Sequence, residues 1–420
     1  MQSKKQFRNL ISRTISRVAK IALATATVFA LTVVLTQSAQ AQIFKVIHAF
    51  SGGGDGGSPW AGLTIDKAGN LYGTASVGGA DGDGTVYRLQ YKGSGWVFTP
   101  LYSFRGSPDD GAYPSAAVVF GPGGSLYGTT AQGGVQECGN GSSPCGTVFN
   151  LKPAAIACKT ALCPWTETVL YYPDGGEGGA FPAGLTFDPA GNMYYTASVS
   201  HQGGVVKLAP SNGGWQFNLS CNVSSSIPSG VILDAAGNLY GGGGGGGGNG
   251  FVFQLNMSGG VCTENILYSF QGGIDGADPS GGLIFDDSGN LYGSTAVGGL
   301  RVGGTAFELS PSNGNWTFRL LYSFAGTEGP TASLTMDAAG NLYGTTFKDG
   351  AYGAGTVFKL TPSGGSWQYT SLHDFTGGSD GRWPASNVTF DANGNLYGTA
   401  PGGGSQNCYQ GCGVVWEITP

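Results

Sequence analysis

The phrase Gly-Asn-Leu-Tyr-Gly, with close variants, occurs seven times in this 420-residue chain and constrains its fold more than any other feature. The tyrosines of successive copies are 46 to 67 residues apart. That period is too long for one turn of a solenoid and is typical of a four-stranded propeller blade. We therefore predict an all-β fold, a seven-bladed β-propeller. The copies occupy residues 69–73, 124–128, 191–195, 237–241, 289–293, 340–344 and 394–398.

Each copy contains four short apolar segments separated by turn residues, as expected for strands. In the sixth copy these are residues 331–337, 341–347, 355–361 and 367–375, which we name strands A to D. The turn from A to B begins with an aspartate that can accept N–H groups, and it contains a glycine free to take positive φ. We interpret six such aspartates as structural: Asp66, Asp188, Asp234, Asp286, Asp337 and Asp391.

The last copy has strands A, B and C but no D strand before the sequence stops. Residues 42–50 have the sequence expected for that D strand. His48 and Phe50 occupy the positions that His373 and Phe375 hold in strand D of the sixth copy. We predict that this N-terminal strand completes the seventh blade. Closing the ring in this way would remove two exposed sheet edges.

The residue types of the repeat indicate how the blades pack. The glycine after each Leu-Tyr pair leaves room for an aromatic side chain, which we expect from the adjacent blade. In the fourth copy, Gly241–Gly248 replace the usual residues. We expect strand B to fray there; a phosphate-cradling loop is a weaker alternative because no Gly-Lys-Ser/Thr follows. The tryptophans near the start of strand D are assigned to blade packing rather than to a ligand: Trp96, Trp165, Trp215, Trp316 and Trp367.

The first 41 residues have the order of a secretory signal. Six basic and no acidic residues accompany an uncharged apolar segment, residues 21–36, and Ala39-Gln40-Ala41 forms a small-residue cleavage site. The apolar segment is shorter than the roughly 20 residues that span a bilayer. We predict a cleaved signal peptide over residues 1–41 and a single propeller domain over residues 42–420. The protein is then secreted, or held at the cell surface or in the periplasm.

Removal of the signal changes the charge. The remaining chain carries 13 basic and 25 acidic residues, a net charge of −12. Nucleic acid is not expected as a partner, because its binding needs a basic surface. No second apolar run follows that could hold a membrane, and we expect a monomer.

Eight cysteines in an exported chain favour disulfides over metal sites. Local spacings favour three bridges and leave Cys221 and Cys262 as a fourth pair. A thiolate metal site is the alternative, and it is disfavoured because no histidine lies near a cysteine at zinc-ligand spacing. We expect no metal and no cofactor. The three local pairs are Cys138 with Cys145, Cys158 with Cys163, and Cys408 with Cys412.

Two stretches carry a family resemblance: "GNLYGTTFKDGAYGAGTVFKL" (340–360) and "PAGLTFDPAGNMYYTAS" (182–198). They resemble the GloVer tandem repeat of choice-of-anchor proteins, which are exported bacterial proteins of unknown molecular function. The resemblance covers nearly the whole mature chain and implies export. Members commonly end in a surface-anchoring segment, whereas this sequence stops inside a blade. The pattern P-x-GL-x-x-D-x-x-GN-x-Y within the second stretch is also similar to NHL-type propellers. This similarity implies that strand A is innermost. Neither resemblance supplies a catalytic residue.

If strand A lines the channel, its residues there are small, such as Ala61, Gly62 and Ala332, with Asn387 as the one stronger polar group. Propeller hydrolases and lactonases would place carboxylates, histidine or a metal at that mouth. We therefore expect no central-channel enzyme. The three histidines do not suggest one either: His48 and His373 take a packing position in strand D, and His201 lies in a loop without a neighbouring carboxylate.

The remaining candidate face is formed by the D to A and B to C loops, which emerge on the same side of each blade. Asp-Gly-x-x-Pro repeats there, with aromatic residues near the proline. Exposed rings stack on sugars, and carboxylates accept hydroxyl hydrogen bonds or hold Ca²⁺. The structural interpretation, which we favour, is that each aspartate caps a turn and each aromatic ring fills a gap between blades. The candidate ligand-binding residues are Asp55, Trp60, Asp110, Tyr113, Asp275, Asp380 and Trp383, with Phe181 in a related position.

These features indicate an exported, non-catalytic binding or scaffold module. Polysaccharide, other cell-envelope material or a cell-surface protein is the expected partner. The alternative is a secreted polysaccharide hydrolase or lyase that uses loop acids such as Asp110, Asp275 or Asp380 as acid and base. A purely structural role in the envelope is the third possibility.

Overall fold

Strands form where β-branched and aromatic residues alternate between turns rich in Gly, Asn and Asp. The computed structural model describes residues 42–135, 137–138, 143–153, 165–199, 202–212, 214–224, 229–244, 248–257 and 259–420. Within this part of the chain, strands are joined by turns and by one 3₁₀ turn at Pro122–Gly124. It contains no helix long and apolar enough to cross a bilayer. The predicted signal peptide lies outside the described residues.

Seven four-stranded antiparallel sheets follow one another along the chain. The first four consist of β2 (Thr64–Ile65), β3 (Leu71–Ala75), β4 (Thr85–Tyr91) and β5 (Trp96–Ser103); β7 (Val119–Phe120), β8 (Leu126–Thr130), β12 (Thr147–Lys152) and β13 (Thr166–Tyr171); β14 (Leu185–Phe187), β15 (Met193–Val199), β16 (Gln202–Ser211) and β17 (Gly214–Val223); and β18 (Ile232–Leu233), β19 (Leu239–Gly243), β20 (Phe251–Asn256) and β21 (Thr263–Ser269).

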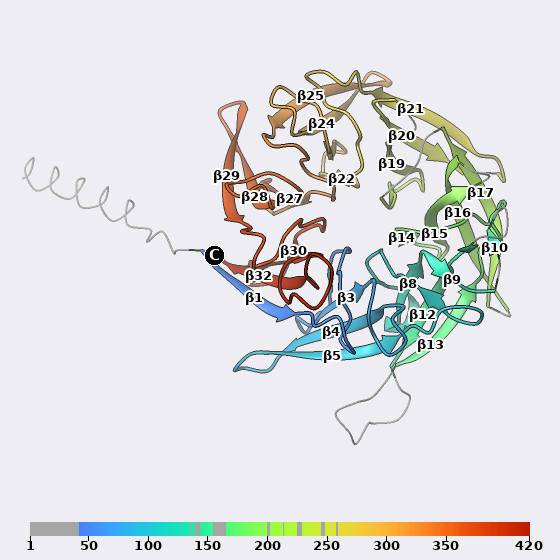
Figure 1. Ribbon diagram of the computed structural model, residues 1–420. Helices are drawn as coiled ribbons and strands as arrows, with labels where there is room; N and C mark the ends of the chain where they lie inside the picture. Colours follow the sequence, from blue (N-terminus) through green and yellow to red (C-terminus); the bar gives the residue numbers. More distant parts are fainter. Residues whose placement is uncertain are drawn as a thin grey trace, which may run out of the picture. The chain divides into compact units, whose positions relative to one another are not determined.

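The last three sheets complete the ring of seven blades, in which successive sheets surround a central opening (Figure 1). This confirms the predicted all-β, seven-bladed propeller. The inner A strands are only two or three residues long, shorter than the predicted segments. The sheets consist of β22 (Ile284–Phe285), β23 (Leu291–Thr295), β24 (Thr305–Ser312) and β25 (Asn315–Ser323); β26 (Thr335–Met336), β27 (Leu342–Thr346), β28 (Thr356–Ser363) and β29 (Ser366–Asp374); and β30 (Thr389–Phe390), β31 (Leu396–Ala400), β32 (Val414–Thr419) and β1 (Ile43–Ala49).

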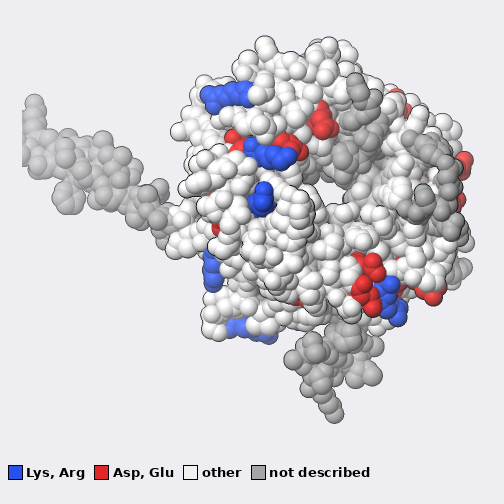
Figure 2. Space-filling model, in the orientation of Figure 1, with Lys and Arg blue, Asp and Glu red and all other residues white. Residues whose placement is uncertain are grey.

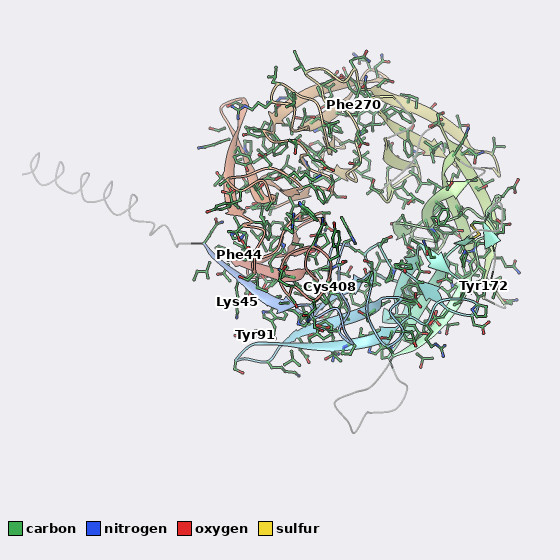
Figure 3. The ribbon with its side chains drawn as sticks, in the orientation of Figure 1. Phe44, Lys45, Tyr91, Tyr172, Phe270 and Cys408 are labelled. Atoms are coloured by element: carbon green, nitrogen blue, oxygen red, sulfur yellow. A yellow bond between two sulfur atoms is a disulfide. The ribbon has the colours of Figure 1, made fainter. Side chains whose placement is uncertain are left out.

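The N-terminal strand β1 closes the ring, as predicted. It pairs antiparallel with β32 from Ile43 opposite Thr419 to Ala49 opposite Val414. The side chain of Phe44 is labelled in Figure 3. Its ring stacks on His373 of the sixth blade with ring centroids 3.5 Å apart. Because β1 comes from the opposite end of the sequence, the two chain ends hold the seventh blade together.

The A to B turns are built by their aspartates, as predicted. Asp337 accepts hydrogen bonds from the backbone N–H groups of Ala339 and Asn341 and from the Asn341 side chain, and Tyr343 Oη donates to it at 3.1 Å. Burial raises the pKa of Asp337, but these hydrogen bonds outweigh it and hold that pKa below its usual value. The five other turns repeat this use of Asp and Tyr: Asp66, Asp188, Asp234, Asp286 and Asp391.

The tryptophans of strand D pack between blades, as predicted. Each lies against the repeated tyrosine of the preceding blade, with ring centroids 5.5 to 6.5 Å apart. The prediction for the repeated glycine was wrong in one respect. The aromatic ring over Gly344 is Phe358, which stands opposite it on strand C of the same blade and not on the adjacent blade. The space over this glycine is thus filled from within the same blade. The repeated tyrosine and the strand D tryptophan make the contacts between neighbouring blades.

Three predicted disulfides are present: Cys138–Cys145, Cys221–Cys262 and Cys408–Cys412. The pair Cys158 and Cys163 lies outside the described residues, as does His201. In the glycine-rich fourth copy, β19 remains a strand through Gly243, so the expected fraying does not begin at Gly241.

Two histidines, His48 in the closing blade and His373 in the sixth blade, give the protein a predicted pH dependence. His48 Nε2 lies 3.2 Å from Asp55, and His373 Nε2 lies 3.2 Å from Asp380. Burial lowers the pKa of both histidines, although the aspartates oppose it. The folded state therefore favours neutral histidine, and stability is lost as pH falls below the unfolded-state pKa of about 6.5.

Tyrosine occupies the same position in other blades, where Tyr102 donates to Asp110 and Tyr268 to Asp275. We expect His48→Tyr combined with His373→Tyr to melt with less loss between pH 7 and pH 5 than the parent. Thermal melts at half-unit pH steps measure this difference. Parallel curves for the two proteins would show that these histidines do not carry the acid sensitivity.

Candidate functional site

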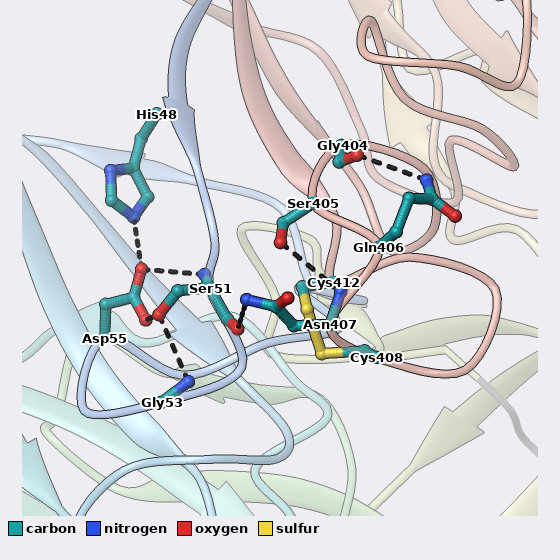
Figure 4. Close-up of a disulfide and its surroundings, with 10 residues drawn as sticks. All are labelled: His48, Ser51, Gly53, Asp55, Gly404, Ser405, Gln406, Asn407, Cys408 and Cys412. Atoms are coloured by element: carbon teal, nitrogen blue, oxygen red, sulfur yellow. Dashed lines mark hydrogen bonds and ion pairs between the residues drawn. A yellow bond between two sulfur atoms is a disulfide. The ribbon is translucent and has the colours of Figure 1, made fainter.

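The four repeated aspartates of the D to A loops cap the turns that follow strand D. Asp110 is 2% exposed and accepts hydrogen bonds from Tyr102 Oη at 2.7 Å and the Arg105 N–H at 2.9 Å. Asp55 binds His48, the Ser51 N–H and the Ser51 hydroxyl near the Cys408–Cys412 disulfide (Figure 4). Asp275 and Asp380 repeat this arrangement. Their carboxylates are thus occupied within their own loops.

In five of the described D to A loops, the residue before the proline has a left-handed backbone. Tyr113, Phe181 and Trp383 have φ values of 56°, 52° and 60°, a conformation that costs non-glycine residues on the order of 1–3 kcal/mol. The Tyr113 and Phe181 side chains remain 40% and 45% exposed. In the first blade the corresponding residue is Ser58, and the exposed ring is Trp60 after the proline. The loop fold therefore presents aromatic side chains instead of burying them.

A cavity of about 640 Å³ lies at the centre of the ring. Figure 2 shows the central opening with acidic and basic side chains near its rim. The small residues predicted for strand A line the cavity, among them Ala61, Gly62 and Ala332, together with Asn387. Of the candidate ligand-binding residues predicted from the sequence, Trp60 lines this cavity.

Two carboxylates line the same cavity, which contradicts the predicted carboxylate-free channel mouth. They are Asp278 and Glu328, and they come from D to A loops rather than from strand A. Glu328 Oε2 forms an ion pair with Lys348 Nζ at 2.8 Å. Lys348 Nζ also lies 5.2 Å from the centroid of the Phe347 ring. Burial, and then the nearby Glu328 charge, raise the pKa of Asp278.

A row of aromatic rings joins three blades at this mouth. Phe347 lies between Trp60 and Trp383, with ring centroids 6.2 and 5.9 Å apart and planes within about 22° of parallel. Trp60 remains 42% exposed. The two candidate tryptophans are therefore brought into one arrangement, through a phenylalanine that sequence reasoning had not selected.

Three cavity-lining hydroxyls have no hydrogen-bond partner among the described residues: Ser229, Ser280 and Thr331. They come from three consecutive blades and can donate to or accept from a molecule in the cavity. An exposed indole, two carboxylates and free hydroxyls can together bind a polar ring compound. Among the described residues, no group of three His, Cys, Asp or Glu side chains is placed to hold a metal ion.

Sequence reasoning missed both cavity carboxylates, although a signal existed. Asp278 stands directly before Pro279, in the position that Tyr113 and Trp383 hold before their prolines, and Glu328 precedes Gly329-Pro330. The repeated Asp-Gly-x-x-Pro pattern instead singles out Asp275, three residues earlier. The capping aspartates recur because the turn needs them, whereas the pre-proline position varies from blade to blade.

No curated protein matches this sequence significantly. Among solved structures, the chain is similar to an ulvan lyase from a new family of polysaccharide lyase, bound to -[GlcA(1-4)Rha3S]-, at 11% identity and a TM-score of 0.52; the match covers 89% of this chain and 95% of that one. It is also similar to an aldose sugar dehydrogenase from Streptomyces coelicolor, at 11% identity and a TM-score of 0.43, covering 90% and 98% of the two chains. At 11% identity, the likeness to the ulvan lyase shows the fold alone.

The repeat itself identifies the family. The Gloeobacter/Verrucomicrobia repeat matches residues 22–241, 138–335 and 318–420, segments that overlap and together cover most of the chain. This agrees with the resemblance drawn from the repeated "GNLYG" phrase. The chain belongs to the Gloeobacter/Verrucomicrobia repeat family.

Proposed function

We propose that this protein is an exported propeller that binds carbohydrate at the mouth of its central channel without transforming it. The observation that carries the proposal is the convergence of an exposed Trp60 ring, the Asp278 and Glu328 carboxylates and unpartnered hydroxyls on one cavity. Its volume of about 640 Å³ falls within the range of about 300–1,000 Å³ found for small-molecule sites.

The chemistry of the cavity suits a sugar. The apolar face of a pyranose ring packs on an indole, and its hydroxyls donate to carboxylates and exchange hydrogen bonds with serine and threonine. Phe347 supports Trp60 from one side, so the indole is held in place before a ligand arrives. A site ordered in advance loses less entropy on binding.

Export of the protein is part of the proposal. The disulfides Cys138–Cys145, Cys221–Cys262 and Cys408–Cys412 support it, because such bonds persist mainly outside the cytoplasm. The basic and apolar order of residues 1–41 supports it from the sequence side.

Retention of the purified protein on a panel of insoluble polysaccharides and cell-envelope fractions tests the proposal. We expect Trp60→Ala to weaken retention at least tenfold, because removing a central aromatic contact typically costs about 2 kcal/mol or more. The control is Tyr409→Ala, which removes a side chain that is 92% exposed and outside the cavity lining. Equal retention of Trp60→Ala and the parent would contradict the proposed site.

A second candidate function is cleavage of the bound polysaccharide by Asp278 and Glu328. The observation that favours it is the difference between the two carboxyl groups: the pKa of Asp278 is raised, whereas the Glu328 carboxylate is ion-paired with Lys348. Such a pair resembles the acid and base of glycoside cleavage. Release of soluble sugars by the parent, abolished in Asp278→Asn, would support catalysis, and unchanged substrate after prolonged incubation would exclude it.

A further inference from the structure

Arg382 contacts Trp383 at one end of the aromatic row, and the fold makes room for it. Its backbone bridges Gly402, and the corresponding bridges in other blades pair Glu328 with Lys348 and Ala277 with Val297. A Cβ atom on Gly402 would lie 2.6 Å from Arg382 Cγ. Glycine at this position therefore leaves room for the arginine stem, which a side chain there would displace.

The guanidinium group of Arg382 is held in place without an acidic partner. Its Cζ lies 3.7 Å from the centre of the Trp383 ring, a close cation–π contact. No carboxylate among the described residues is within ion-pair distance of it, and its Nε is buried without a hydrogen-bond partner. Asp380, two residues earlier, directs its carboxylate to His373 and Thr376 instead.

Among the described residues, a second cation contacts the aromatic row, Lys348 over Phe347, and it is already paired. Lys348 pairs with Glu328 at 2.8 Å, so Arg382 is the cation of the aromatic row that keeps its hydrogen-bonding capacity. Arginine presents a rigid fork of donors that matches the two oxygens of a carboxylate or sulfate. The row from Trp60 through Phe347 to Trp383 connects this fork with the cavity.

We infer that the carbohydrate bound at the channel mouth is acidic, and that Arg382 binds its carboxylate or sulfate group while Trp60 contacts a sugar ring. This inference rests on the proposed function. It makes Arg382 the residue that selects acidic over neutral polysaccharide. The net charge of −12 on the mature chain repels an acidic polymer at a distance, so the attraction is local to this site.

The experiment compares two matched pairs of polymers on the purified protein: polygalacturonate with its methyl ester, and dextran sulfate with dextran. The first pair differs in carboxylate and the second in sulfate. We expect at least one acidic member to bind at least tenfold more tightly than its neutral partner, and to lose affinity as salt rises.

Arg382→Gln is expected to weaken acidic binding at least tenfold and to leave neutral binding unchanged, because a charge-assisted hydrogen bond is lost. Arg382→Lys keeps the charge but loses the fork, so intermediate affinity is expected. Arg301→Gln is the matched control, since it removes an exposed cation from a loop of the fifth blade. Thermal melts of all variants check that the fold is intact.

The outcomes separate the two claims. Selective loss of acidic binding in Arg382→Gln, but not in Arg301→Gln, supports the inference. If Arg382→Gln binds as the parent does while Trp60→Ala does not, or if neutral and acidic polymers bind equally, the inference is overturned and the proposed function stands. Failure of every polymer to bind would overturn both.

Discussion

Deletion of residues 42–50 is expected to abolish cooperative unfolding of the propeller. It removes β1, which pairs with β32 along its length, and the fully buried Phe50 that follows this strand. Losing one buried phenylalanine costs about 3–5 kcal/mol, whereas a whole domain is stable by only about 5–15 kcal/mol. The deletion also exposes the β32 edge and opens the ring between the seventh and first blades.

Denaturant unfolding followed by tryptophan fluorescence and by circular dichroism measures this effect. Ile43→Ser serves as a control, because Ile43 is 63% exposed and its replacement should leave the transition in place. A synthetic peptide of residues 42–50 should restore a cooperative transition by adding a strand to the open edge. A truncated protein that unfolds at the parent's midpoint would refute ring closure.

Gly398→Ala is expected to destabilise the closing blade by about 1–3 kcal/mol, through overpacking. Gly398 stands opposite Trp416 on the neighbouring strand, and a Cβ atom there would overlap the indole. Trp416 is fully buried, so the ring cannot move aside into solvent. Equilibrium unfolding in guanidinium chloride gives the change in free energy.

Two further variants make this prediction specific. Gly95→Ala adds the same methyl group in open space and should change stability by less than about 0.5 kcal/mol. Combining Gly398→Ala with Trp416→Leu should cost less than the sum of the two changes, because the smaller side chain relieves the overlap. Additive costs, or a stable Gly398→Ala, would show that the glycine is not required by the indole.

Most of the fold could be predicted because its determinants are local and repeated. The turn aspartates, the Leu-Tyr-Gly strand and the D-strand tryptophans each recur at a fixed place, so periodicity alone indicates four strands to a blade. Ring closure followed from the match of His48 and Phe50 to His373 and Phe375. The strand that carries the aromatic ring over Gly344 could not be predicted in the same way. Strand C of the same blade and the adjacent blade both contain aromatic residues that could reach it.

The candidate site was less predictable because it breaks the repeat. The seven blades bring different residues to one central mouth: Asp278 where another blade has Tyr113, and Glu328 where another has Arg382. Their proximity depends on the ring bringing loops together that are 50 residues or more apart in sequence. The repeated aspartates recur because the turns need them, and their carboxylates form hydrogen bonds within those turns.

The most direct test of a carbohydrate site at the channel mouth is a crystal structure of the protein with an oligosaccharide cut from the polymer it retains. We predict a sugar ring against the exposed indole of Trp60, with hydroxyls within hydrogen-bond distance of Asp278 or Glu328. An oligosaccharide bound at the outer rim beside Asp110 or Asp275, with the central cavity free of sugar, would contradict this account.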